Sequence, residues 1–457
     1  MRTLMSLWLL IGCGEPDAED PAPTTTTAPS SWTSSTTTGN TGKTTATGTS
    51  WTPGATSFCD PLPAASGGTV TLSPADGAGA IQDALDAAAE GDTVLLEDGI
   101  YDLETYTLTL RTPGVTLRSA SGDPASVTLD ANLGSTVAVS IEASDAMLAE
   151  VSILDPFFEG VVVTPSNDRD AHITGASIYR VHVIDPGRSG FLVQADVSGQ
   201  WFADEGELAC NRVELTPAGR DRFPTTCLVG GVEIRRARGW SIRDNHLEDL
   251  WCDAAAAAPA ISVQEGSRDT VVERNLIEDC ATGLQLGDSD ATSARTYDDV
   301  TCDEALIQHV GGVLRNNVIV ATSTSLHLSD TGFDVGVAVV GTCDVAVLHT
   351  TIFSTEDPIR SALWIEGVGT TGVVANTLAS HGLIRRDDAP LEVDHILEDA
   401  DGGLFVYPPD GDLHLSPGAS RGVDEGSDAY LDLCPEDIDG HERGEAPDLG
   451  ADELLLR

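Results

Sequence analysis

The 457-residue sequence contains few cations. Lys and Arg total 24 against 73 Asp and Glu, so the formal net charge is −49, and Lys43 is the one lysine. This charge excludes a nucleic-acid binder, because phosphate recognition needs clustered cations, and it disfavours adhesion to an anionic membrane surface. A polyanionic polysaccharide is also repelled unless a divalent cation bridges it to the protein. A lysine base or Schiff base is excluded from the folded part.

Long hydrophobic runs are absent as well. The run at residues 4–11 follows Arg2 and is far shorter than the roughly 20 residues that span a bilayer, so residues 1–12 are predicted to be a signal peptide. The run ends in LIGC, which resembles the bacterial lipobox. The resemblance implies lipidation of Cys13, export, and anchorage in the outer membrane of a Gram-negative cell on its periplasmic or surface side. An ordinary signal peptide that contains a cysteine is the alternative.

Aliphatic residues are almost missing between residue 13 and residue 57. This stretch is built from Thr, Ser, Pro and Gly, with Trp32 and Trp51 as incidental aromatics. Such a composition cannot bury enough apolar surface to offset the entropy of ordering. We therefore expect a disordered tether that joins the lipid to the folded domain.

Closely spaced cysteine pairs of the CxxC kind are missing, which disfavours a zinc site. The cysteines after Cys13 are Cys59, Cys210, Cys227, Cys252, Cys280, Cys302, Cys343 and Cys434. Eight cysteines suit an oxidising compartment and allow 105 pairings. Cys210 with Cys227 is the favoured pair because both flank one polar loop, and Cys252 and Cys280 are further disulfide candidates.

The body of the sequence repeats a short pattern: an alternating strand, a turn, a second strand, an Asn, and a third strand. An Asn followed two residues later by an aliphatic residue recurs at intervals of 26 to 42 residues, with Thr350 in the same slot once. The Asn positions are Asn211, Asn245, Asn275, Asn317 and Asn376. One such repeat cannot bury its own apolar side, so the strands must stack into parallel sheets around a shared core.

This pattern resembles the right-handed parallel β-helix, the pectate-lyase-like fold. The resemblance implies an all-β, single-stranded helix over residues 58–402, with the Asn residues forming a ladder at the turn between the second and third sheets. Residues 80–90 are predicted to form a short amphipathic helix with Ile81, Leu85 and Ala88 on one face. In this family such a helix caps the first coil.

The C-terminal residues 403–457 resemble the terminal module of bacterial choice-of-anchor Q proteins. The resemblance rests on the segments at 412–426, 437–443 and 448–453, although the first segment departs from the pattern at residues 419–424. Asp437 and Asp439 have some features of a calcium loop but lack its third ligand and terminal Glu. They are weak candidates for Ca²⁺, the one possible cofactor.

In β-helix enzymes the substrate groove follows the outer face of the first sheet. Strand alternation predicts which side chains point outward there. The outward set is Glu233, Arg235, Ser262, Gln264, Gln285, Trp364 and Glu366. Amides and carboxylates that bond hydroxyls, beside an indole that stacks on a ring, suit a carbohydrate; an ordinary solvated sheet face is the alternative.

Candidate catalytic residues are Glu233, Arg235 and Asp288. A lyase would need Arg235 as its base, but arginine stays protonated outside special sites. Hydrolysis needs two carboxylates about 5–10 Å apart. Glu233 and Glu366 are expected to be several coils apart, and Asp288 is a possible second acid near Gln285. Ser-His-Asp catalysis lacks its GxSxG elbow.

The leading interpretation is a monomeric cell-envelope lipoprotein whose β-helix binds carbohydrate or an envelope partner without catalysis. Its membrane contact is expected through the lipid alone, and nucleic acid is excluded. The alternatives are an atypical polysaccharide lyase or glycoside hydrolase, and a structural spacer.

Overall fold

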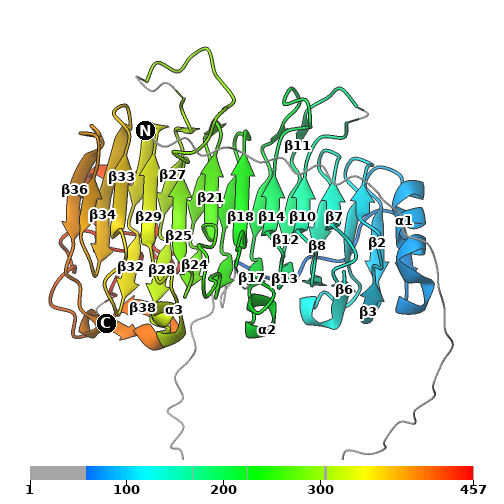
Figure 1. Ribbon diagram of the computed structural model, residues 1–457, viewed down its shortest axis with the longest axis horizontal. Coiled ribbons are helices and arrows are strands. Elements are labelled where there is room, and N and C mark those ends of the chain that lie inside the picture. Colours follow the sequence, from blue (N-terminus) through cyan, green and yellow to red (C-terminus); the bar gives the residue numbers. More distant parts are fainter. Residues whose placement is uncertain (1–57, 168, 224, 303–305, 456–457) are drawn as a thin grey trace, which may run out of the picture. The chain divides into compact units, whose positions relative to one another are not determined.

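The computed structural model describes residues 58–455 except 168, 224 and 303–305 (Figure 1). The predicted signal peptide, Cys13 and the tether lie outside the described residues. Within the described part, no helix is both long and apolar enough to cross a membrane.

The chain winds into coils of three short strands, and each strand pairs in parallel with the equivalent strand of the neighbouring coils. This is a right-handed parallel β-helix, as the sequence predicted. The first sheet has ten strands, which are β4 (Leu108–Leu110), β7 (Val137–Ile141), β10 (Glu159–Val163), β14 (Ser189–Val193), β18 (Gly230–Arg235), β21 (Ile261–Gln264), β25 (Thr282–Leu286), β29 (Val335–Val340), β33 (Ser361–Glu366) and β35 (Leu383–Arg385).

The second and third sheets meet at a sharp corner and are continuous in the last coils. The second sheet comprises β1 (Thr69–Leu72), β2 (Thr93–Leu96), β5 (Thr116–Ser119), β8 (Met147–Ala149), β12 (Ser177–Tyr179), β16 (Glu207–Ala209), β19 (Ser241–Arg243), β23 (Val271–Glu273), β27 (Val313–Arg315) and β31 (Val345–Leu348). The third comprises β3 (Gly99–Asp102), β6 (Val127–Asp130), β9 (Ser152–Leu154), β13 (His182–Ile184), β17 (Arg212–Glu214), β20 (His246–Glu248), β24 (Leu276–Glu278), β28 (Val318–Ala321) and β32 (Thr351–Ser354). Strands β34 (Gly372–Ala379) and β36 (Glu392–Leu397) run through both.

The remaining elements lie at corners and ends. They are β11 (Ile173–Thr174), β15 (Ala203–Asp204), β22 (Ser267–Arg268), β26 (His309–Val310), β30 (Thr342–Cys343), β37 (Phe405–Tyr407), β38 (Asp412–Leu415), α2 (Pro217–Arg220), α3 (Thr324–Leu328), and the 3-10 turns η1 (Pro74–Asp76), η2 (Pro124–Ser126), η3 (Gly402–Leu404), η4 (Pro408–Asp410) and η5 (Asp428–Tyr430).

Helix α1 (Gly77–Ala87) covers the first coil, as the sequence predicted (Figure 1). Ile81 and Leu85 are fully buried beneath it, and Gln82 bonds the backbone of Thr109 on β4 through both ends of its amide. The helix ends before Ala88, whose backbone is extended. Because α1 lies over the open end of the coil, that end offers no edge for further strand pairing.

The core is a column of Val, Ile and Leu side chains that point inward from all three sheets. Where the third sheet turns into the first, the space is too small for most side chains. A Cβ on Gly231 would lie 2.0 Å from Leu247 Cδ2 and 2.4 Å from the carbonyl oxygen of Ala260. The repeated glycine at the start of first-sheet strands therefore reflects close packing at this corner.

The corner between the second and third sheets is a turn with one residue in the left-handed conformation. From the third coil onward this residue is Glu150, Arg180, Cys210, Asp244, Arg274, Asn316, His349, Asn376 and His395. The next position carries the amide ladder. Asn211 Nδ2 donates to Asn245 Oδ1 (3.0 Å), Asn245 Nδ2 to Asn275 Oδ1 (2.9 Å), and Asn275 Nδ2 to Asn317 Oδ1 (2.9 Å).

The placement of Asn376 in this ladder is wrong. Thr351 pairs with Val318 and with Leu378, so the slot after Asn317 holds Thr350 and then Thr377. Asn376 stands one residue earlier, in the left-handed position, where its amide contacts His349 Nε2 and Ser427 O, each at 2.9 Å. The Asn-x-aliphatic pattern could not separate these two adjacent positions.

The C-terminal residues fold back onto the outside of the second and third sheets. Leu404, Leu413 and Leu415 pack with outward-facing Val318 and Phe353. Arg443 is buried among them, donating to Asn316 Oδ1 (2.9 Å), Ala451 O (2.9 Å) and Gly450 O (3.1 Å). These residues therefore complete the outer surface of the β-helix, while their kinship to the choice-of-anchor module remains a prediction.

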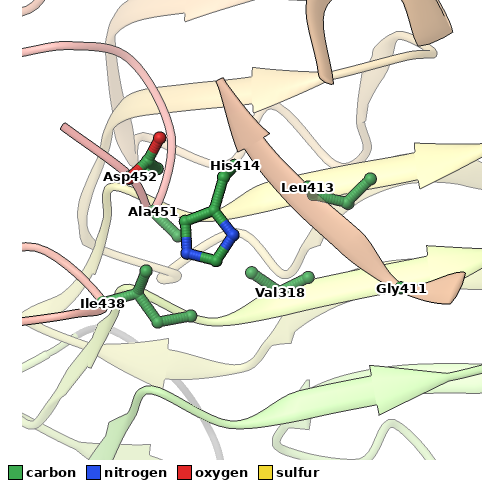
Figure 2. Close-up of a pocket in the computed structure, with 7 residues that line it drawn as sticks. All are labelled: Val318, Gly411, Leu413, His414, Ile438, Ala451 and Asp452. Carbon is green, nitrogen blue, oxygen red and sulfur yellow. The ribbon is translucent and has the colours of Figure 1, made fainter. Parts of the chain in front are cut away.

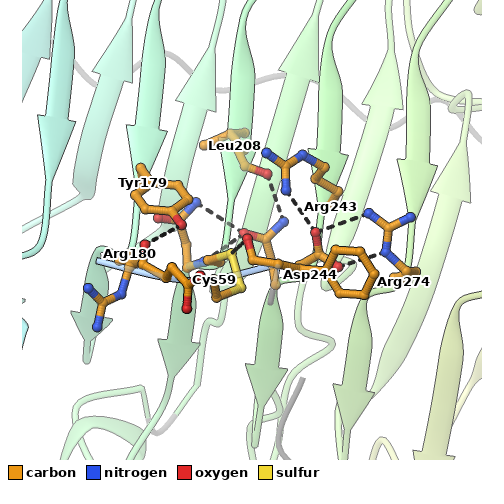
Figure 3. The surroundings of a disulfide bond; sticks show 12 residues. Cys59, Tyr179, Arg180, Leu208, Arg243, Asp244 and Arg274 are labelled. Atoms are coloured by element: carbon orange, nitrogen blue, oxygen red, sulfur yellow. Dashed lines mark hydrogen bonds and ion pairs between the residues drawn. A yellow bond between two sulfur atoms is a disulfide. The ribbon is translucent and has the colours of Figure 1, made fainter. Parts of the chain in front are cut away.

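Residues 58–66 form a strap across the turns between the second and third sheets (Figure 3). Its contacts are the Cys59–Cys210 disulfide, a hydrogen bond from the Tyr179 hydroxyl to Asp60 O (2.7 Å), one from Leu62 N to Glu150 Oε1 (2.8 Å), one from Arg118 to Pro63 O (2.7 Å), and the Arg274 guanidinium 4.7 Å from the Phe58 ring centre. The strap thus touches several successive coils.

The favoured disulfide, Cys210 with Cys227, is wrong. The pairs are Cys59–Cys210, Cys227–Cys252 and Cys302–Cys343, while Cys280 and Cys434 are unpaired and buried. Cys210 lies at a turn that faces the strap, whereas Cys227 lies beyond the third sheet. Two cysteines that are close in sequence but lie at different corners of a coil cannot form a disulfide. The partner comes instead from the strap or from the same corner of another coil.

The ladder predicts a graded loss of stability. Asn275→Val removes the partners of Asn245 N, Asn245 Nδ2 and Ile242 O at once, all of them buried. We expect a loss of about 2–4 kcal/mol in the free energy of unfolding. Asn211→Val, at the end of the ladder, leaves fewer groups without a partner, namely Val181 N and Ile178 O. In urea unfolding this variant should therefore lose less stability than Asn275→Val. Equal losses would contradict a cooperative ladder.

A buried imidazole predicts acid sensitivity. Complete burial lowers the pKa of His309 on β26 to about 4. The unfolded chain, with a pKa near 6.5, takes up this proton first, so stability is lost as pH falls from about 6.5 toward 4. Between pH 7.5 and 4.5, His309→Met should reduce the wild-type loss by about 2–3 kcal/mol in denaturant titrations. The control is His172→Met, which replaces an exposed histidine. If stability depended on pH equally in His309→Met and wild type, His309 would not be the source of the acid sensitivity.

Candidate functional site

The outer face of the first sheet holds the predicted site residues in two adjacent rows. Glu233, Ser262, Gln285 and Trp364 lie in the central row, paired across β18, β21, β25, β29 and β33. Arg235 and Gln264 are paired in the second row, where Val340 is paired with Glu366. All seven face outward, but they do not share one groove. Glu233, Arg235 and Ser262 line one hollow and Glu366 lines a second, whereas Gln264, Gln285 and Trp364 line neither.

The first hollow is built around the Glu233 carboxylate. Oε1 accepts from Arg235 Nε (2.7 Å) and Gln264 Nε2 (2.9 Å), while Oε2 lies 3.3 Å from the Ser189 hydroxyl and 3.6 Å from Arg188 Nη2. Oε1 is therefore occupied by two donors, while Oε2 has one long hydrogen bond and a more distant ion pair. Glu233 and Arg235 hold each other in place on the sheet face.

A buried second acid lies beside this network. Glu159 is paired with Arg188 Nη1 at 3.3 Å. Burial raises the pKa of Glu159, although the Arg188 charge opposes the shift. The hollow itself has a volume of about 190 Å³ and is walled by Leu228, Ala258 and Pro259 from the loops that precede β18 and β21. It offers both charge signs over a rigid polar floor.

The second hollow is acidic. It has a volume of about 230 Å³, and its charged lining residues are Asp288, Glu366 and Asp387, with Gln308 beside them. Asp288 follows β25 and Glu366 ends β33, two strands further along the sheet. At about 4.8 Å per strand, this places the two carboxylates roughly 10 Å apart along the sheet. Asp288 therefore groups with Glu366 and not with Glu233.

Trp364 lies at the edge of the second hollow and is half-buried. Its indole Nε1 donates to Glu366 Oε2 (2.8 Å), and the ring packs with Val335, Ala338 and Val340. Arg386 and Arg360 place their guanidinium carbons 5.0 and 5.5 Å from the ring centre. The indole is therefore an anchored wall of the sheet face, and less of its ring is open for stacking than the sequence suggested.

The expected continuous stripe is interrupted between the hollows. Ser262 and Gln264 are only 6% and 9% exposed, because Gln264 folds onto Glu233 and the insertion after β25 covers the adjoining corner. In that insertion Arg295 N donates to Glu265 O (2.8 Å) and the Tyr297 hydroxyl to Gly266 O (2.9 Å). The expectation of one open groove is corrected to two hollows on one face.

Sequence reasoning missed Arg188, Ser189, Glu159 and Asp387. Glu159 and Ser189 start first-sheet strands, so strand alternation alone could have placed them beside the site. Arg188 and Asp387 lie in loops, and only the three-dimensional arrangement brings them to the hollows.

The calcium expectation at Asp437 and Asp439 is not supported by the geometry. The buried Asp437 carboxylate accepts from the backbone N–H groups of Asp439 (2.9 Å), His441 (2.8 Å) and Glu453 (3.2 Å), and its Oδ2 lies 3.1 Å from His441 Nδ1. Its lone pairs are used to shape a turn. Asp439 instead lies 3.2 Å from His414 Nε2.

His414 supplies the positive charge at this place (Figure 2). Burial opposes its protonation, but hydrogen bonds to Asp412 and Asp439 and the nearby Asp452 raise the pKa of His414 to about 10. Burial raises the pKa of Asp452 to about 6. The enclosed cavity beside them measures about 10 Å³, roughly the room of one water molecule. The His414 imidazolium therefore neutralises carboxylates that would otherwise attract a calcium ion.

Comparison with known proteins finds similar solved structures but no family. No family model matches the chain, and no curated protein matches it either. Among solved structures it is similar to pectate lyase Pel9A, with 11% identity over 85% of this chain and 97% of that chain and a TM-score of 0.47. It is also similar to the catalytic unit of a GH87 α-1,3-glucanase from Streptomyces thermodiastaticus strain HF3-3, with 14% identity over 77% of this chain and 72% of that chain and a TM-score of 0.42. A third similar structure is the surface protein and adhesin PfbA of Streptococcus pneumoniae, with 11% identity over 72% of this chain and 97% of that chain and a TM-score of 0.41. At these values no function passes from one protein to another.

The Glu233 network predicts a stability effect with a defined coupling. Glu233→Gln leaves Arg188 and Arg235 short of a counter-charge in a half-buried place, so we expect a loss of about 1–3 kcal/mol in the free energy of unfolding. Adding Arg235→Gln should recover part of this loss in a double-mutant cycle. Arg421→Gln, which breaks an exposed pair with Asp399, should leave the free energy of unfolding nearly unchanged. Strict additivity would show that Glu233 and Arg235 act separately.

Proposed function

We propose that this protein is an exported cell-envelope lipoprotein whose β-helix binds a neutral carbohydrate on the outer face of the first sheet without cleaving it. The observation that carries the proposal is the pair of hollows on one rigid sheet face, lined by carboxylate, guanidinium, amide and hydroxyl groups. Side chains held on paired strands lose little entropy when a ligand binds, which favours recognition.

The proposal of binding without cleavage rests on the state of the candidate catalytic groups. Glu233 and Arg235 are bound to each other and to Gln264, Ser189 and Arg188. A lyase would need a base that can lose a proton, and Arg235 is instead held as the ion-pair partner of Glu233. The first hollow is therefore suited to holding a ligand.

A glycoside hydrolase is the second candidate, and one observation favours it. Asp288 and Glu366 line the same hollow, at a separation near the upper limit for a pair of catalytic carboxylates. Asp387 adds a third acid there. A purely structural spacer is the remaining alternative, and it requires neither hollow.

The charge supports a neutral ligand. A net charge of −49 repels uronate polymers, and the second hollow has acids as its only charged lining residues. Hydroxyl groups can donate to these carboxylates without any ionic requirement. We therefore place neutral hexose polymers before polyanions as ligands.

The location is proposed from the sequence and the cysteines. The lipobox-like LIGC segment supports lipidation of Cys13, and three disulfides among the described residues suit an oxidising compartment. We propose an outer-membrane anchor with membrane contact through the lipid alone, and a monomeric domain.

A glycan array on the full chain tests the proposal. Binding to a neutral polysaccharide should weaken at least tenfold in Leu228→Arg, because a charged side chain in the wall of the first hollow obstructs the ligand and leaves the polar floor intact. Leu328→Arg, a matched change of an exposed leucine on α3, should bind like wild type.

Product analysis on the same polymers separates the alternatives. New reducing ends that disappear in Asp288→Asn would establish hydrolysis and refute binding without cleavage. Unsaturated products would refute it in favour of a lyase. No binding to any polysaccharide would leave the spacer as the better description.

A further inference from the structure

The outer face of the third sheet carries a group of charged side chains that the carbohydrate proposal does not use. His182, Arg212 and His246 occupy one outward row on β13, β17 and β20, and their strands pair in register. A second row contains Glu214, Glu248 and Glu278 on β17, β20 and β24. Each cation faces the glutamate of the following coil.

Three contacts describe a diagonal ladder of ion pairs. Arg212 contacts Glu248 and also lies 2.8 Å from Glu214 Oε2. His182 Nε2 lies 3.6 Å from Glu214 Oε1, and His246 Nε2 lies 3.1 Å from Glu278 Oε2. A ladder of surface ion pairs would explain one arginine opposite two carboxylates, but it leaves the geometry around His246 unexplained.

His246 Nε2 approaches two carboxylates at once. It lies 3.1 Å from Glu278 Oε2 and 3.5 Å from Glu248 Oε2. All three atoms lie within 4.8 Å of one another. Ligands held about 2.0–2.2 Å from one tetrahedral metal ion are separated by about 3.3–3.6 Å. The two nitrogen–oxygen distances are close to this spacing, and the two carboxylates can reach it by a small side-chain adjustment.

The charges of this group call for a further cation. Glu248 and Glu278 lie directly opposite each other on neighbouring parallel strands, where like charges destabilise a sheet. Arg212 is the one permanently charged cation among the six side chains, and it is directed at Glu214 and Glu248. Among the described residues, His246 is the one ion-pair partner of Glu278.

A second imidazole on the same sheet face has an unsatisfied nitrogen. His182 Nε2 is buried and has no hydrogen-bond partner among the described residues, since its 3.6 Å approach to Glu214 is too long for one. His182 lies on the same face as His246 but two strands away, roughly 10 Å along the sheet, so it stands outside the group at His246.

We propose that His246, Glu248 and Glu278 bind one divalent first-row transition metal ion, with zinc as the best match to a donor set of one imidazole and two carboxylates. The side chains are 18–24% exposed, which allows a hydrated ion to enter and water to complete the shell. Arg212 holds the other oxygen of Glu248 and so fixes the orientation of this ligand. The ion joins two successive coils across β20 and β24.

Cobalt and zinc titrations of the full chain test this site. Co²⁺ added to chelator-treated protein should produce the visible absorption of low-coordinate cobalt with one equivalent, and Zn²⁺ should abolish it by displacement. Zn²⁺ should also raise the melting temperature. The His246→Gln and Glu278→Gln variants should each lose the absorption and the shift, whereas His395→Asn, altered at an exposed imidazole paired with Asp394, should keep both.

The outcomes are decisive because circular dichroism reports folding independently. A folded wild type without cobalt absorption would overturn the proposal. Absorption that survives in folded His246→Gln and Glu278→Gln would also overturn it by placing the metal elsewhere. If one variant fails to fold, the other carries the test.

Discussion

Each coil reverses direction at the junction of the second and third sheets through one residue in the left-handed conformation, and the residue that follows enters the interior. In four successive coils that residue is an asparagine whose side-chain N–H donates to the backbone of the preceding coil. The amides of Asn211, Asn245 and Asn275 also bond the amide of the next coil. This repeated bond keeps the coils in register. Every outward row on all three sheets depends on that register, because a slip of one residue would exchange buried and exposed faces.

Register also dictates the chemistry of the surface. Equivalent residues in neighbouring coils stand about 4.8 Å apart, so a repeated carboxylate must find a partner or a counterion. At Glu233 the partners are arginines and a glutamine, at Asp439 the partner is a protonated His414, and at Glu248 and Glu278 they are Arg212 and His246. An acidic protein with almost no lysine thus uses arginine and histidine as its fixed cations.

Features that follow from strand alternation and repeat spacing could be predicted from the sequence. Contacts between segments that are distant in the sequence could not. Alternation placed Glu233 and Trp364 outward, and the Asn spacing located the ladder from Asn211 to Asn317. The partners that hold Glu233 come from β14, β18 and β21, and no spacing rule reports them. Cys59 finds Cys210 across 151 residues because the strap returns along the coils, which local pattern cannot show.

The strap has a mechanical consequence. Residues 1–57 join the β-helix at residue 58, beside Arg274, and Cys59 is bonded to the turn at Cys210 in the middle of the coil stack. Tension on the N-terminal segment therefore enters the stack through its side, at the turn that carries Cys210. The first coil and its capping helix are spared from the load, so the protein resists being unwound from its end as long as the disulfide is intact.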